Sequence, residues 1–143
     1  MVKVEFSKMI NRPVEEVFTF VTDPANNARW QDGLVESRVT SSGPMGVGTQ
    51  VTDVRKFLGR DMDSKLEVTA FEPNKKFAQK VVKGPLPFEI IMTLEPSGSG
   101  TKVNLVAQGE PGGFFKLAEG MVQKQLQNQL EGDAERLKKA LEG

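Results

Sequence analysis

The sequence contains no cysteine, no histidine and no tyrosine. Without cysteine there is no disulfide and no thiol nucleophile. Without cysteine or histidine, the usual ligands of zinc, copper and haem are missing, as are the Ser-His-Asp and Cys-His catalytic relays. We therefore expect no metal, no cofactor and no catalytic residue of these kinds. Acid–base chemistry could still be done by carboxylates, lysines or water.

Net charge and long apolar runs are also absent. The 143 residues include 19 Lys plus Arg and 19 Asp plus Glu, so the formal net charge is zero. This balance argues against a nucleic-acid partner. No stretch approaches the ~20 apolar residues of a membrane span. The N-terminus lacks the apolar core of a signal peptide, so the cytoplasm is the expected location. The length fits one domain over residues 1–143, with the oligomeric state left open.

Apolar and polar residues alternate along most of the chain. Alternation over residues 2–6 predicts a first strand, and two short helices follow. The first begins at Pro13, and the second is capped by Asp23 and ends near Trp30. Six further strands are expected at 34–40, 49–58, 62–70, 77–82, 88–94 and 101–107, separated by turn residues. Together these segments predict one antiparallel sheet of about seven strands.

The last part of the chain has a helical period. Its apolar residues are spaced three to five apart, at Phe114, Leu117, Met121, Leu126, Leu130, Ala134, Leu137 and Leu141. A helix of ~28 residues would be about 42 Å long, enough to cross the sheet. The prediction is an α+β fold in which this helix covers one face of a curved sheet. Because a straight rod cannot fill a curved trough, we expect an apolar cavity between them.

A series of short motifs occurs in a characteristic order. They are Pro13-Val14-Glu15-Glu16-Val17-Phe18, Asp23-Pro24, Trp30, Gly48-Thr49, Gly59-Arg60, the run from Glu67 to Phe77, and Gly100-Thr101-Lys102-Val103. Together they resemble the START-like (SRPBCC) superfamily, and within it the polyketide cyclase/dehydrase and lipid-transport group. The resemblance covers nearly the whole chain and implies the helix-grip fold. It also implies binding of hydrophobic small molecules, and some members act as aromatases or cyclases on polyketides.

Large apolar side chains are the expected lining of the cavity. They are Phe57, Phe77, Phe88, Met92, Phe114 and Met121. Methionine suits variable apolar ligands because its side chain is unbranched and adaptable. Trp30, the single tryptophan, either closes one end of the barrel or forms a cavity wall. Each of these residues could instead belong to an ordinary core.

Asp53 and Arg55 share one face of the strand expected at 49–58. If that face points inward, Arg55 could bind an acid or carbonyl oxygen of a ligand. If it points outward, the two form a solvated pair of little energetic consequence. Val54 and Leu58 compete for the core face, which favours the outward orientation.

Three functions are compatible with this sequence. The leading one is binding or transport of a small, mostly apolar molecule in the cavity. The alternative is a cyclase or aromatase that orients a reactive chain, with Asp53 or Glu89 as base and Arg55 as partner of the developing oxyanion. The lack of histidine and tyrosine counts against the enzyme. A third is an interaction module, which would require an exposed apolar patch.

Overall fold

Seven strands form one antiparallel sheet in a computed structural model that describes residues 2–57, 59–84, 88–109 and 119–143. The strands are β1 (Val2–Ile10), β2 (Leu34–Val39), β3 (Gln50–Phe57), β4 (Arg60–Glu72), β5 (Lys76–Lys83), β6 (Phe88–Ser97) and β7 (Gly100–Gly109). Their order is β1-β7-β6-β5-β4-β3-β2. Strands β2 to β7 therefore form a meander, and the first strand pairs with the last.

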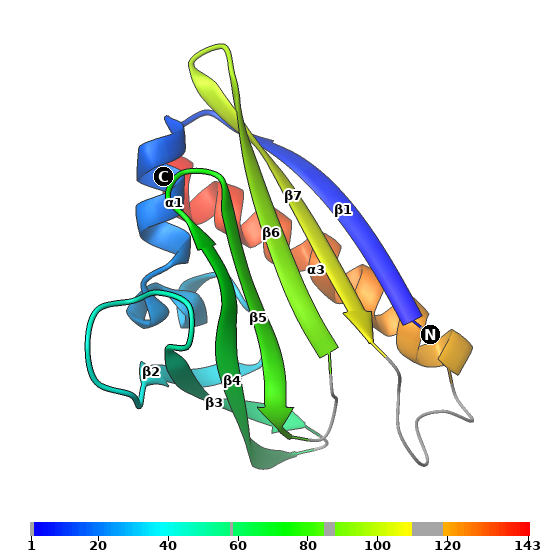
Figure 1. Cartoon of the computed structure of the whole chain (residues 1–143). Helices are drawn as coiled ribbons and strands as arrows, with labels where there is room; N and C mark the ends of the chain where they lie inside the picture. The colour runs from blue at the N-terminus through cyan, green and yellow to red at the C-terminus, as the bar shows by residue number, and fades with distance from the viewer. Residues whose placement is uncertain (1, 58, 85–87, 110–118) are drawn as a thin grey trace.

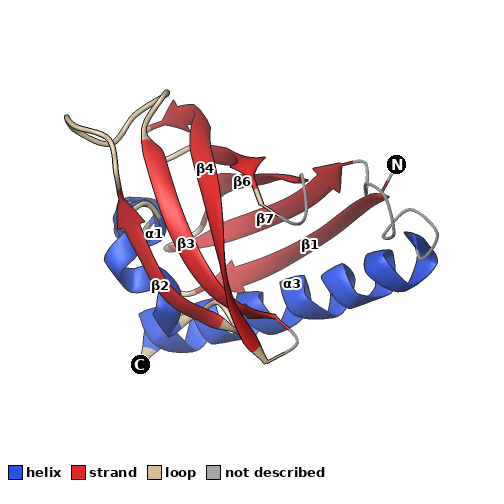
Figure 2. Ribbon diagram, turned by 90° about the horizontal axis from the view of Figure 1, so that it is seen from below, coloured by secondary structure: helices blue, strands red, loops and turns tan. Residues whose placement is uncertain are grey.

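The helices are grouped on one side of this curved sheet (Figure 1 and Figure 2). They are α1 (Val14–Val21), the 3-10 helix η1 (Pro24–Arg29) and α3 (Glu119–Glu142). Helix α3 runs alongside β1, the edge strand, and α1 and η1 lie at one end of the sheet. None of the helices in the described part of the chain is long and apolar enough to span a membrane. The α+β architecture predicted from the sequence is confirmed.

Strand register defines the face of the sheet that points toward α3. Met92 of β6 lies opposite Phe77 of β5 and Leu105 of β7, and all three side chains are buried in the main core. The same face continues onto β3 and β4, where Val51 lies opposite Leu66 and both are buried. We call this side of the sheet the inner face.

The short helices start as their sequences dictate, with two local differences from expectation. Pro13 is the N-cap of α1 rather than its first residue, with an extended ψ of 151°. The second helix is a 3-10 helix, and the Asp23 carboxylate accepts a hydrogen bond from the Ala25 N–H at 3.0 Å. Asp23 thus satisfies one of the backbone donors that a helix start leaves unpaired.

The apolar stripe of α3 begins one residue later than predicted. Met121 is 74% exposed, so its predicted place in the cavity wall is wrong, and Val122 is buried instead. Steps of four residues from Val122 through Leu126 and Leu130 to Ala134 stay on one helix face. The five-residue step from Met121 to Leu126 leaves that face.

The stripe generates a stability prediction. Leu130→Ala should lower the free energy of unfolding by about 2–5 kcal/mol, because Leu130 is buried in the main core. Met121→Ala is the matched control on the same helix and should change it by less than about 0.5 kcal/mol. Urea denaturation measures both values. Equal losses in the two variants would show that the buried face of α3 is wrongly assigned.

Candidate functional site

Part of the inner face is covered only partly by the rest of the protein. Five side chains there remain half-buried, although strand register places them beside buried core residues: Met62 and Ser64 of β4, Gln79 and Val81 of β5, and Ile90 of β6. We call these five residues the inner patch. Three of them are apolar, and the other two offer a hydroxyl and a carboxamide. The patch can therefore contact an apolar molecule and also hydrogen-bond to it.

Asp53 and Arg55 of β3 border this patch on the inner face. Asp53 lies opposite Ser64 and Arg55 opposite Met62 in the β3–β4 register. Asp53 is only 5% exposed. The outward orientation favoured by the sequence is therefore wrong.

Hydrogen bonds explain why a carboxylate can be buried at this place. The Ser37 hydroxyl donates to Asp53 Oδ1 at 2.6 Å, and Arg55 Nη2 lies 3.7 Å from Asp53 Oδ2. Arg55 also donates to the side-chain oxygen of Gln31. The Arg55 side chain keeps 34% of its surface exposed, so part of its guanidinium remains open to solvent or a ligand.

Two buried carboxylates near Arg55 have perturbed acidities. Burial raises the pKa of Asp53 above 3.8, against the opposing effects of the Ser37 hydrogen bond and the Arg55 charge. Burial likewise raises the pKa of Asp133 on α3, against hydrogen bonds from the Asp32 N–H and Arg136. Removal from water disfavours the charged form of both groups.

The segment 30–32, between η1 and β2, is bonded to α3. Arg136 Nε donates to the Trp30 carbonyl at 3.1 Å, and the Asp32 N–H donates to Asp133 Oδ1 at 3.1 Å. Gln129 Nε2 donates to the Asp32 carbonyl at 3.1 Å, and Arg136 also pairs with Asp133. We call these contacts the α3 clasp. Because Gln31 in the same segment accepts from Arg55, the clasp connects α3 to β3.

The predicted cavity residues fall into several environments. Trp30, Phe77 and Met92 are buried in the main core, whereas Phe88 belongs to a smaller cluster with Val2 and Val122. The Phe57 side chain and Phe114 lie outside the described residues. Trp30 Nε1 and the nearby Asn27 Oδ1 are buried without a hydrogen-bond partner among the described residues.

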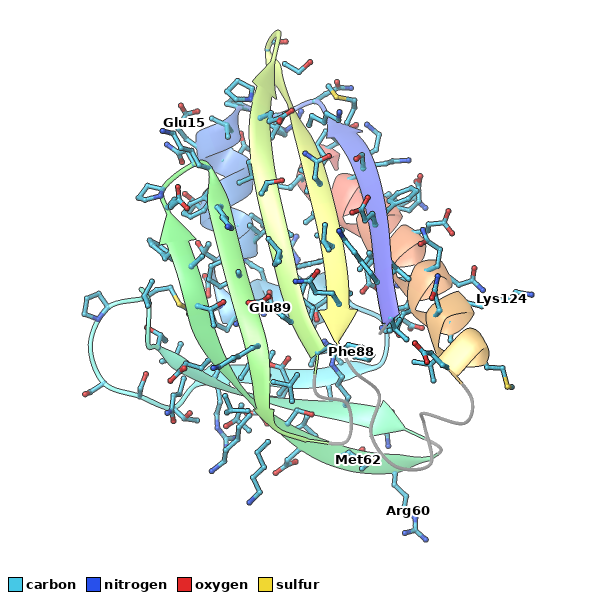
Figure 3. The ribbon with its side chains drawn as sticks, turned by 45° about the vertical axis from the view of Figure 1, so that its right-hand side comes forward. Glu15, Arg60, Met62, Phe88, Glu89 and Lys124 are labelled. Atoms are coloured by element: carbon cyan, nitrogen blue, oxygen red, sulfur yellow. The ribbon has the colours of Figure 1, made fainter. Side chains whose placement is uncertain are left out.

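Glu89, one of the two bases considered from the sequence, lies on the opposite face of the sheet. It follows Phe88 at the start of β6 (Figure 3). Its carboxylate accepts hydrogen bonds from Thr69 and Gln108, each at 3.3 Å. Its register partners are Lys80 and Gln108, one position away from the inner-facing Ile90. Glu89 therefore cannot act as a base over the inner patch.

Sequence reasoning missed the partners of Asp53 and Arg55. Gln31, Ser37, Asp133 and Arg136 have no motif that marks them as a cluster. The one available signal is Asp133, a charged residue on the apolar stripe of α3. No group of three acidic side chains among the described residues is arranged to hold a metal ion.

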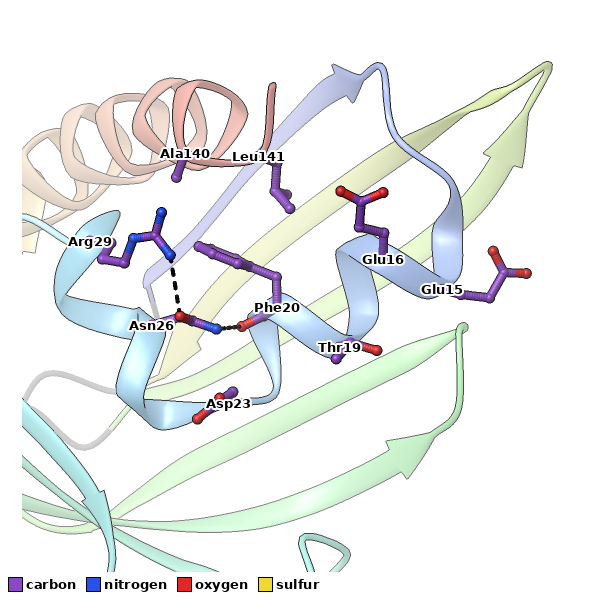
Figure 4. A pocket seen from close by; sticks show the side chains of 9 residues that line it. All are labelled: Glu15, Glu16, Thr19, Phe20, Asp23, Asn26, Arg29, Ala140 and Leu141. Atoms are coloured by element: carbon purple, nitrogen blue, oxygen red, sulfur yellow. Dashed lines mark hydrogen bonds between the residues drawn. The ribbon is translucent and has the colours of Figure 1, made fainter. Parts of the chain in front are cut away.

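Two surface grooves lie away from the inner patch. One, of about 560 Å³, lies between α1, η1 and the end of α3, and the Arg29 guanidinium sits 5.1 Å from the centre of the Phe20 ring there (Figure 4). Carboxylates of Glu15, Glu16 and Asp23 line it. The other, of about 420 Å³, lies along the start of α3. Neither groove includes Arg55 or the inner patch.

The burial of Asp53 generates a prediction about pH. As pH rises above the ordinary carboxyl pKa of about 4, Asp53 should contribute progressively less stability, because its raised pKa means that ionisation is less favourable in the fold than in the unfolded chain. Asp53→Asn keeps an oxygen for the Ser37 hydroxyl but cannot ionise. Its free energy of unfolding, relative to the native protein, should therefore rise over this range. Urea titrations at a series of pH values measure this difference, and a constant difference would contradict the assignment.

Solved structures of other proteins share this fold. A START superfamily protein from Mycobacterium smegmatis has a TM-score of 0.80 at 16% identity, covering 98% of this chain and 97% of that one. Protein NE0264 from Nitrosomonas europaea has a TM-score of 0.78 at 17% identity, covering 99% and 94%. TTHA0849 from Thermus thermophilus has a TM-score of 0.73 at 20% identity, covering 96% and 98%. At these identities the likeness establishes the fold alone.

Sequence comparison supplies the family. No curated protein matches the sequence. The model of the family described as polyketide cyclase/dehydrase and lipid transport matches residues 1–142. The motifs that resemble this group are thus part of a match over nearly the full chain, and the protein belongs to the polyketide cyclase/dehydrase and lipid transport family.

Proposed function

We propose that the protein binds a small, mostly apolar molecule against the inner patch, between the sheet and α3, and acts as its carrier. The observation that carries this proposal is the incomplete cover of the patch. Met62, Val81 and Ile90 expose apolar surface on the inner face, where core residues would otherwise be buried. Concave apolar surfaces with a few polar groups are typical ligand sites. Membership of a family that includes lipid transport supports the same function.

Arg55 is the proposed polar anchor for this molecule. Its guanidinium has five donors, and Gln31 and Asp53 occupy one side of it. The remaining donors can bind a carbonyl, carboxylate or sulfonate oxygen at the edge of the patch. Ser64 and Gln79 offer further hydrogen bonds within it.

The predicted apolar residues are assigned to the walls of this site. Phe77 and Met92 lie beside the patch on the same face. Trp30, in the main core, and Phe88, in the smaller cluster, are assigned to the rest of the wall. Phe57 and Phe114 remain predictions from the sequence.

A second candidate function is a cyclase-type reaction in the same place. The raised pKa of Asp53, next to a cationic Arg55, favours it. Asp53 would accept a proton from the carbon beside a ketone, while Arg55 would donate to the enolate oxygen that forms. Native mass spectrometry of the purified protein discriminates between the two functions. A bound molecule recovered unchanged after incubation supports carriage. Conversion that is lost in Asp53→Asn supports the enzyme.

Filling the patch tests where the ligand binds. Val81 and Val82 are neighbours on β5, but Val81 belongs to the inner patch, whereas Val82 lies at the register shift between β4 and β5 and is 50% exposed. Val81→Trp should weaken binding of the fluorescent probe 8-anilinonaphthalene-1-sulfonate by at least about tenfold, because the ring occupies the site. Val82→Trp is the matched control and should leave the affinity unchanged. Equal affinities in the two variants would place the probe elsewhere.

Removing the anchor tests the role of Arg55. Arg55→Gln should weaken binding of the same anionic probe by about ten- to hundredfold, because a hydrogen bond to a charged group is lost. Binding of the uncharged dye Nile red should change little. Arg60→Gln, at the exposed β3–β4 turn (Figure 3), is the control for loss of one positive charge. An equal loss for both dyes, or for both variants, would contradict the proposed contact.

A further inference from the structure

The outer edge of β2 carries a short self-complementary sequence, Val35-Glu36-Ser37-Arg38-Val39. β2 is the last strand of the sheet, so one of its edges is hydrogen-bonded to β3 and its other edge has no neighbouring strand in the sheet. Val35 and Val39 are 50% and 39% exposed, which is unusual for valines within a strand. Val35 lies where the register with β3 shifts, between Leu34 and Glu36. Glu36 and Arg38 are exposed and pair with each other at 3.1 Å.

The backbone of this strand has unpaired groups directed at solvent. The Thr40 N–H donates to the Gln50 carbonyl of β3, so alternate residues of β2 point their backbone groups toward β3. Ser37 and Val39 have the opposite parity, and their N–H and C=O groups therefore point away from the sheet. Exposed edges of this kind are templates for a further strand.

The two edges of the sheet differ in whether side chains hydrogen-bond to their backbone. At the β1 edge, Gln127 and Lys138 of α3 donate to the carbonyls of Glu5 and Met9, each at 3.1 Å. Among the described residues, no side chain donates to a backbone carbonyl of Val35, Ser37 or Val39. The β1 edge is capped by the protein's own helix, whereas within the described ranges the β2 edge has no such cap.

We propose that the β2 edge pairs with the β2 edge of a second copy of this chain. An antiparallel pairing about a two-fold axis at Ser37 places Glu36 opposite Arg38 of the second copy, within the regular part of β2. Val35, at the register shift between Leu34 and Glu36, and Val39 lie at the two ends of this contact. Opposite charges then meet twice across the axis, and the exposed valines flank them. Two outward-directed Ser37 backbones hydrogen-bond to each other at the axis.

This arrangement selects a second copy rather than another partner. Two-fold symmetry requires that each side of the contact complement itself, and the five residues do so in both charge and apolar character. A strand of six residues buries less surface than a stable dimer needs. The dimer is therefore weak and dependent on concentration. The contact uses the free edge of β2 and does not include the inner patch, which lies on β4, β5 and β6.

Charge reversal tests the pairing by sedimentation velocity over concentrations reaching about 1 mM. Glu36→Arg and Arg38→Glu should each weaken association by about tenfold, because like charges then meet twice across the axis. The double variant E36R/R38E restores opposite charges and should restore association. Glu5→Arg is the matched control, because Lys3 and Glu5 form an exposed pair of the same spacing on the capped edge.

Each outcome bears on the proposal. Circular dichroism and urea unfolding confirm that each variant is folded as the native chain is. Association that is weakened by the single reversals and recovered by the double reversal supports the pairing. A native protein that stays monomeric throughout, single reversals without effect, a double variant that does not recover, or an equal effect of Glu5→Arg would overturn it.

Discussion

The contact between α3 and segment 30–32 holds the whole site together. An apolar stripe alone would let α3 shift along the sheet, since hydrophobic contacts have little directionality. The clasp of Asp133, Arg136 and Gln129 adds directional bonds to the backbone of Trp30 and Asp32. Because Gln31 lies between these two residues and binds Arg55, the position of the helix and the orientation of the proposed anchor are fixed together.

This arrangement places two carboxylates in the interior. Asp53 and Asp133 lose their contacts with water on burial. Hydrogen bonds and ion pairs replace these contacts in part, from Ser37 and Arg55 to Asp53 and from Asp32 and Arg136 to Asp133. A well-packed apolar cluster would often stabilise a fold as well as buried ions do. Stability alone therefore does not account for the two carboxylates, which agrees with the proposed role of Arg55 as a polar anchor. Asp53 is the one of the two that lies opposite a residue of the inner patch, Ser64.

Alternation and turn residues predicted the meander, the two short helices and the terminal helix, because these patterns report local burial. The burial of Asp53 was not predicted in this way, because Asp53 is stabilised in the interior by a hydrogen bond from Ser37 and an ion pair with Arg55, which hydrophobicity does not report. Its neighbour Val54 was the better candidate for the core on hydrophobicity, yet it lies on the outer face. The partnership of Arg55 with Gln31 spans 24 positions and two elements, and no local pattern encodes it. The prediction for Met121 was wrong because Met121 lies five residues before Leu126, one more than the four-residue step that keeps a side chain on the buried face of α3.

The pairing of β1 with β7 has a consequence for synthesis and folding. β1 leaves the ribosome before the other strands of the sheet, yet its strand partner ends at Gly109 and its capping helix ends at Glu142. A nascent β1 therefore waits with an unpaired edge until the rest of the sheet and α3 have been translated. Such long-range closure slows folding and prolongs the exposure of an aggregation-prone strand. Premature termination before Gln127 would remove both capping contacts to that strand.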